Sequence, residues 1–214
     1  MTTPPIAPRL LKGAIIGMDI YNPLASVAVF QYNPDTISRK LTARTPRREL
    51  GARAEALRLV GPPRETVTVQ VEVDAADQAG GAATAVGVHA PVAAMEMLLY
   101  PKSLFVILNW AVMQGGLTNI VAPQAPLTLF VWGPSRVVPV KITDMTITEE
   151  AHDNMLNPIR ARVDLTMTVL SYYDLPPTHA GSVLFMVHQV TKELLATSNT
   201  GWSVANFGSS LKIF

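Results

Sequence analysis

The sequence contains no cysteine. This absence excludes disulfide bonds, thiolate metal sites and cysteine nucleophiles together. The first 17 residues also lack the basic, then apolar, then small-residue order of a secretory signal, because three prolines precede the first cation. We therefore expect synthesis and folding in the cytoplasm, with any export by another route.

Charge is scarce, and long apolar runs are missing. Charged residues make up 15% of the 214 residues, apolar residues make up 49%, and the formal net charge is +1. So small a net charge gives little general attraction to nucleic acid or anionic lipid, and we expect neither as a partner. The longest apolar run, Leu104 to Met113, is too short to cross a bilayer and contains Asn109. The remaining explanation for the apolar excess is burial against other protein subunits.

Motifs for catalysis, metal binding or cofactor binding are also missing. The four histidines, at positions 89, 152, 179 and 188, have no zinc-site spacing, and the glycines at 80–87 lack the ending of a phosphate-binding loop. The segment Glu149 to Asp153 gathers four titratable side chains. A solvated acidic loop is the favoured interpretation, because adjacent residues diverge rather than converge on one ion. A metal-dependent enzyme using this segment is the alternative. Because the solvated loop is the favoured interpretation, we expect no cofactor and no enzymatic activity.

Two segments alternate between polar and apolar residues with the period of a β-strand. In 64–74 the valines at 67, 69, 71 and 73 alternate with polar residues, and 160–170 alternates in the same way. The strand at 137–148 is the expected partner of 160–170, and a phase slip between Thr143 and Asp144 predicts a bulge or bend there. The polar faces of the two alternating strands are candidates for a wet lumen or a seam between subunits: Thr66, Thr68, Gln70, Glu72, Arg160, Arg162, Asp164, Thr166 and Thr168.

The remaining pattern predicts a mainly β chain with helices at a few places. A hairpin is expected over 13–19 and 26–31, further strands over 36–43 and 127–132, a helix ending at Pro101, and a C-terminal helix over 182–197 with Ser182 as its N-cap. Periodicity does not separate strand from helix over Leu104 to Met113. The Pro-rich residues 1–11 predict an extended arm, and the last residues, 199–214, predict a tail that orders on contact.

A basic stretch runs from Arg39 to Arg64, with eight basic and two acidic residues. Its central part, 44–61, is expected to be a long exposed loop or a hairpin insertion. Nucleic-acid binding is one interpretation, but the stretch contains no aromatic residue on which a base could stack. The favoured interpretation is contact with the adjacent ring of an assembly through Arg44, Arg47, Arg48, Arg53 and Arg58, complemented by acidic residues such as Glu149, Glu150 and Asp153 on a neighbouring copy.

Several segments, in order, resemble the tube-type domain of contractile injection systems. They are FQYNP at 30–34, GPPRET at 61–66, VEVDAAD at 71–77, HAP at 89–91, FVWG at 130–133, PVKIT at 139–143 and LNPIRA at 156–161. The resemblance spans roughly residues 12–175, and its ordered set is specific although each segment alone is weak. The closest sub-type is the tube initiator or baseplate adaptor.

The resemblance implies an α+β fold, mainly β: a β-barrel or two packed sheets with one flanking helix, plus a C-terminal helix. It divides the chain into an arm (1–11), a tube-type domain (12–175) and a C-terminal helix and tail (176–214) without a convincing LysM module. It implies a structural subunit in a six-copy ring that connects the spike hub to the inner tube, with hub, tube and baseplate proteins as partners. It also implies assembly in the bacterial cytoplasm into a particle that stays there or is released. An ordinary inner-tube subunit is the alternative.

Overall fold

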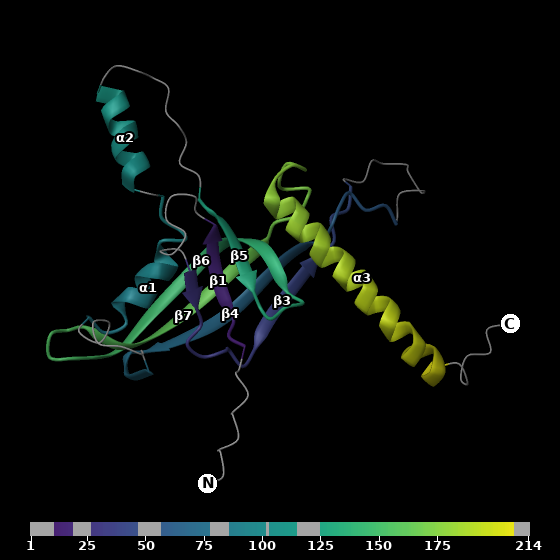
Figure 1. The fold of residues 1–214 in the computed structure, drawn as a ribbon, viewed down its shortest axis with the longest axis horizontal. Coiled ribbons are helices and arrows are strands. Elements are labelled where there is room, and N and C mark those ends of the chain that lie inside the picture. Colours follow the sequence, from purple (N-terminus) through teal and green to yellow (C-terminus); the bar gives the residue numbers. More distant parts are fainter. Residues whose placement is uncertain are drawn as a thin grey trace, which may run out of the picture.

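The computed structural model describes residues 11–18, 27–46, 57–77, 86–101, 103–114 and 125–207, with side chains up to residue 198. The strands are β1 (Ala14–Met18), β2 (Val27–Val29), β3 (Ile37–Thr42), β4 (Arg64–Asp74), β5 (Leu127–Val131), β6 (Val137–His152) and β7 (Pro158–Val169). The helices are α1 (His89–Glu96), α2 (Ser103–Gln114) and α3 (Ala180–Phe207), with a short 3-10 turn at Ala75–Asp77. Figure 1 shows the strands gathered at the centre with the three helices around them.

The strands form one antiparallel sheet in the order β2-β1-β5-β6-β7-β4-β3. The fold is mainly β, as expected, but it is neither a closed barrel nor two separate sheets. The sheet instead curls so that its two ends share one core. Phe30 beside β2 and Val73 of β4 belong to the same buried cluster, and Gln31 makes two hydrogen bonds with the backbone of Asp74 at the far end of the curl, at 2.8 and 2.9 Å. The edges β2 and β3 therefore stay unpaired within the described chain.

Strict alternation determines the two central strands. β4 and β7 pair over nine residues, from Thr66 opposite Thr168 to Asp74 opposite Arg160. Their inward side chains are buried: Val67, Val69, Val71, Val73, Ala161, Val163, Leu165, Met167 and Val169. The prediction of these two strands is confirmed, and so is the expected pairing of β7 with β6.

The expected irregularity in β6 is also confirmed. The register with β7 shifts between Ile142 and Asp144, and the hydroxyl of the extra residue, Thr143, donates to the carbonyl oxygen of Thr166 at 3.0 Å. A bulge of this kind bends the strand and increases its twist. It also returns Asp144 to the polar side of the sheet, so that both halves of a long strand keep one apolar face.

Helix α1 covers part of the core, and its start is fixed by a close backbone approach. Val92 and Met95 are buried, and the N–H of Val88 donates to the carbonyl oxygen of Pro158 at 2.9 Å. Gly87 has φ of +59°, and a Cβ there would collide with that carbonyl oxygen. Only glycine combines this φ with so close an approach.

The other two helices differ from the expectations. The ambiguous segment at 104–113 is helix α2, so the chain forms two helices rather than one before β5. Helix α3 begins at Ala180 and continues to Phe207, well beyond the predicted 182–197. Ser182 is not its N-cap: the N–H of Gly181 donates to Nδ1 of His179 at 3.1 Å, while the Ser182 hydroxyl donates to the carbonyl oxygen of Pro176 at 2.8 Å.

Candidate assembly surface

The nine polar residues expected on β4 and β7 lie together on the face of the sheet that points away from the core. The register places Thr66 opposite Thr168, Thr68 opposite Thr166, Gln70 opposite Asp164 and Glu72 opposite Arg162. None of these side chains is buried. We call this surface, with its continuation on β3 and β6, the polar face. Its role as a lumen or seam stays a prediction.

The polar face extends over four adjacent strands. β6 adds Lys141, Asp144, Thr146, Thr148 and Glu150, and β3 adds Ser38, Lys40 and Thr42. Five cations and five anions occupy its outward positions: Lys40, Arg64, Lys141, Arg160 and Arg162 against Glu72, Asp74, Asp144, Glu150 and Asp164. Its formal charge is therefore zero.

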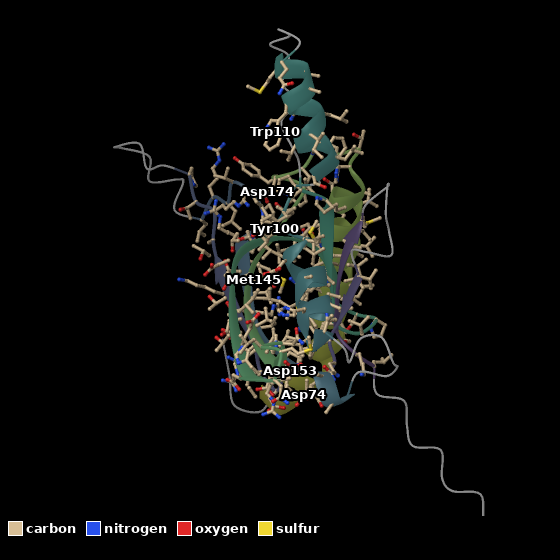
Figure 2. The ribbon with its side chains drawn as sticks, turned by 90° about the vertical axis from the view of Figure 1, so that its left-hand side faces the viewer. Asp74, Tyr100, Trp110, Met145, Asp153 and Asp174 are labelled. Atoms are coloured by element: carbon tan, nitrogen blue, oxygen red, sulfur yellow. The ribbon has the colours of Figure 1, made fainter. Side chains whose placement is uncertain are left out.

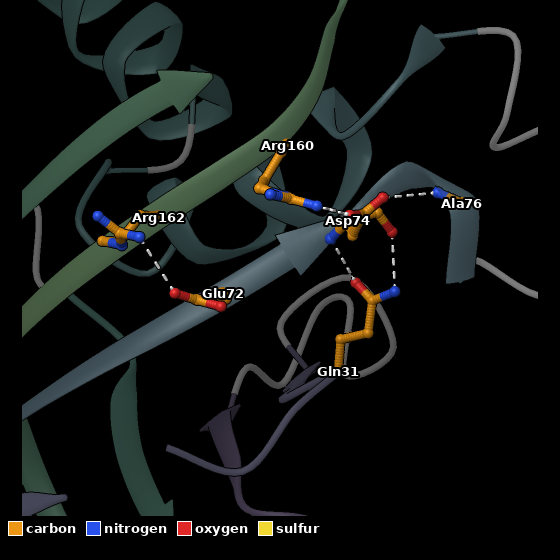
Figure 3. A network of polar contacts seen from close by, with 6 residues as sticks. All are labelled: Gln31, Glu72, Asp74, Ala76, Arg160 and Arg162. Carbon is orange, nitrogen blue, oxygen red and sulfur yellow. Dashed lines mark hydrogen bonds and ion pairs between the residues drawn. The ribbon is translucent and has the colours of Figure 1, made fainter. Parts of the chain in front are cut away.

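Several polar and charged side chains of the polar face contact one another across strands. Gln70 Nε2 donates to Asp164 Oδ1 at 2.7 Å, and Arg162 lies between Glu72 at 3.3 Å and Glu150 at 3.6 Å. Figure 3 shows the Arg162 contact with Glu72 and the one between Arg160 and Asp74, whose charged atoms are 2.9 Å apart. Such exposed pairs add little stability, but they fix the orientation of long side chains. The polar face thus has a formal charge of zero, and contacts across strands hold several of its charged side chains in place.

Asp74 is the junction between this face and the curl of the sheet. The Ala76 N–H and the Arg160 guanidinium hydrogen-bond its carboxylate, and these bonds lower its pKa below the ordinary value. Its backbone N–H and carbonyl are both held by the Gln31 side chain (Figure 3). Sequence reasoning missed Asp74 and Gln31. Their positions at the ends of predicted strands were visible, but their contact spans 43 residues of chain.

The two edge strands of the sheet, β2 and β3, have exposed side chains. Val27 and Val29 of β2 are exposed, and Val29 is 58% exposed. In β3, Lys40 and Leu41 are also exposed. An exposed edge with apolar side chains is a template for another strand, and solitary proteins usually protect such edges. In the described chain, β2 carries no charged or proline residue that would do so.

A buried ionic cluster lies under α3, on the core side of the sheet near β3. Glu65 of β4 has a side chain only 7% exposed, with Arg39 of β3 at 2.6 Å and Lys192 of α3 at 3.3 Å. Burial alone would raise the pKa of Glu65, but the Arg39 hydrogen bond and the two cations outweigh it and lower that pKa. Beside them His188 is buried, and burial together with the charge of Lys192 lowers the pKa of its imidazole. This cluster joins α3 to the β3 edge.

Sequence reasoning missed this cluster for a physical reason. Glu65 lies two residues before Val67, on the same side of β4 as the buried valines. The alternation of the strand was therefore a signal that its carboxylate faces inward. Its two cations come from positions 26 and 127 residues away. No local pattern relates them.

The arginine candidates divide into three kinds. Arg44 is engaged within the subunit: its guanidinium contacts both carboxylate oxygens of Asp174 at 2.9 Å and lies 4.7 Å from the centre of the Tyr173 ring. Arg58 belongs to the described residues and lies in the same segment. Arg47, Arg48 and Arg53 lie outside the described residues.

The acidic candidates are separated rather than gathered. Glu150 is on the polar face beside Arg162, and Glu149 is exposed. Asp153 accepts hydrogen bonds from the N–H groups of Met155 and Asn157, which shape the β6–β7 turn. The hydrogen bond from the Asn157 side chain, followed by those from the two N–H groups, lowers the pKa of Asp153. Within the described part of the chain no group of three or more His, Asp or Glu residues could hold a metal ion.

Comparison with known proteins gives structural neighbours only. The sequence matches no protein-family model and no curated protein. One neighbour is a chain of the virion of a native gene transfer agent particle, at 10% identity and a TM-score of 0.28. Another comes from the tail of an empty gene transfer agent particle with C6 symmetry, at 13% identity and a TM-score of 0.31. Each likeness covers 73% of this chain and 90% of the other. At these TM-scores we draw the function from the surfaces of this chain itself.

Proposed function

We propose that this chain is a structural subunit of a phage-tail-like contractile injection system. In this proposal six copies form a ring at the baseplate end, between the spike hub and the inner tube, and the chain acts as tube initiator or adaptor. An ordinary inner-tube subunit is the variant of the same proposal. The order of segments that resembles the tube-type domain supports both.

The observation that carries the proposal is the curled sheet with two unpaired edges. An apolar core lies on one side of the sheet, a neutral polar face lies on the other, and β2 and β3 are available at its ends. Pairing β2 of one copy with β3 of the next would continue the sheet from subunit to subunit. Such a head-to-tail contact uses two different surfaces, and it closes into a ring when the rotation per subunit is an integral fraction of a turn. In a ring the polar face would line the lumen.

A single substitution at the β2 edge tests this proposal. Val29→Lys places a charge on the exposed edge without removing a buried side chain, and a charged edge opposes strand addition. We expect circular dichroism to stay unchanged while multi-angle light scattering and electron microscopy show loss of the ring. Val29→Thr, which keeps the β-branch and adds no charge, is the matched control and should assemble. If Val29→Lys assembles as well as the control, β2 is not an assembly edge.

A further inference from the structure

Helix α2 presents apolar side chains that the described chain does not cover. None of its residues is buried, and none is charged. Its most exposed large side chains are Leu104, Ile107, Leu108, Trp110 and Met113, each at least half exposed. A helix that is apolar on all sides is normally buried. At 12 residues it is about 18 Å long, against about 30 Å for the apolar part of a bilayer, and none of the described helices could cross a membrane.

Helix α3 has one face on the sheet and a second face that is uncovered. On the face toward the sheet, the α3 residues Ser182, Phe185 and His188 are buried. On the outer side an apolar stripe, defined by Val183, Val187, Val190 and Leu194, is 48% to 65% exposed. From Glu193 to Ser198 every residue is exposed. Figure 1 shows this part of α3 continuing away from the strands.

The spacing of the stripe indicates what can cover it. Its four residues follow one another at intervals of four, three and four, the pattern by which one helix packs along another at a shallow angle. Residues 183–194 span about 17 Å, which is close to the length of α2. An uncharged helix of three turns fits this stripe, and α2 is such a helix.

The two surfaces do not meet within one molecule of the structure. Figure 1 shows α2 and α3 on opposite sides of the strands, and the stripe lies in the first half of α3 with its side chains exposed. Figure 2 shows α2, with Trp110, beyond one end of the sheet. We propose that α2 of one copy docks on the apolar stripe of α3 of a second copy. This contact covers both helices at once, whereas pairing α3 with α3 would leave α2 exposed.

The contact is head-to-tail, like the proposed pairing of sheet edges, and it deepens that proposal because it rests on assembly between copies. A pair of three-turn helices buries less than the roughly 800 Å² per partner of a standard interface. It therefore adds to the strand contact and does not replace it. Lys192 of α3 contacts Glu65 of β4, which contacts Arg39 of β3, so a copy docked on α3 is held near the β3 edge.

Disulfide trapping tests the contact directly, because the native chain has no cysteine. We would assemble the full-length variants Leu108→Cys and Val187→Cys together from an equal mixture, oxidise the product, and separate it on a non-reducing gel. Both side chains are exposed, so neither substitution disturbs the core. Met155→Cys, 81% exposed in the β6–β7 turn, replaces Leu108→Cys as the collision control. We expect at least about tenfold more mixed dimer from the first pair, because a docked contact raises the local thiol concentration.

The other outcomes separate this inference from the proposed function. A dimer of Val187→Cys with itself, without the mixed product, would show that α3 pairs with α3 and would overturn the inference. Rings without a mixed product above the control would overturn it as well and leave the ring proposal standing, with another protein as the partner of these helices. A monomer by light scattering, in the wild-type protein, would overturn both.

Discussion

Replacing Arg39 with methionine should destabilise the subunit more than any other single change in the cluster under α3. The Arg39 guanidinium and the Glu65 carboxylate are 2.6 Å apart, and the Glu65 side chain is 7% exposed. Methionine keeps the length of the side chain but removes the donor. The carboxylate would then keep only the Lys192 contact at 3.3 Å.

The cost follows from what is left behind. Removing one partner of a fully buried pair costs about 3 to 5 kcal/mol, and a hydrogen bond to a charged group contributes about 1.5 to 3 kcal/mol. Arg39 is 27% exposed and Lys192 stays, so we expect about 2 to 3 kcal/mol for Arg39→Met. Lys192→Met should cost no more than about 0.5 kcal/mol, because Lys192 is 41% exposed. The double variant Arg39→Met with Glu65→Leu should recover most of the loss, since no unpaired charge is then buried.

Urea unfolding at one fixed protein concentration measures these differences. For Arg39→Met the midpoint should fall by about 1 M at an unchanged slope. The pKa of Glu65 is lowered from its ordinary 4.5, so its stabilising effect is present above that pH and is lost as the pH falls through the lowered value. The gap between wild type and Glu65→Gln should therefore close in acid. An Arg39→Met midpoint equal to wild type, or a double variant weaker than the single, would refute this account of the cluster.

Two further stability predictions concern the backbone and the Arg44 site. Gly87→Ala should cost more than about 2 kcal/mol, because its Cβ would collide with the Pro158 carbonyl oxygen at a residue of positive φ. Gly133→Ala, with φ of +75° but open space around the Cβ, should cost only about 1 kcal/mol. Thermal unfolding compares the two variants, and equal losses of stability would contradict the collision. Arg44→Ala should lower the free energy of unfolding, measured in urea, by about 1 to 2 kcal/mol. Arg44→Lys should restore less than half of that loss, because lysine lacks the planar group that contacts both Asp174 oxygens and the Tyr173 ring. Full rescue by lysine would show that charge alone matters.

Much of the sheet could be predicted because its strands have a strict period. The alternation in β4 and β7 and the slip at Thr143 determine which side chains face the core, and the structure agrees with each. The hairpin of β1 and β2 was also visible from its two apolar runs. The pairing of β1 with β5, more than 100 residues apart, left no local trace. That pairing and the link from Gln31 to Asp74 turn the expected barrel into an open curl.

The candidate surface was predictable to the same extent. The nine polar residues of β4 and β7 share one face because alternation alone demands it. The basic and acidic candidates shared only a charge, and the structure gives them separate partners: Arg44 contacts Asp174, and Glu150 lies beside Arg162. The position of Glu65 depends on where α3 lies. Helix periodicity indicates which side of α3 is apolar but not which part of the sheet it meets.

The central place of β7 in the sheet has a consequence for biosynthesis. β7 is the last strand to be made, yet it joins β6, with the β5-β1-β2 half, to β4 with β3. Until residue 169 has left the ribosome, the two halves have no strand between them, and pairings this distant in sequence form slowly. A chain that ends before β7 is complete therefore cannot display both edges on one continuous sheet, and in the proposed ring it could not pair with a neighbour on both sides.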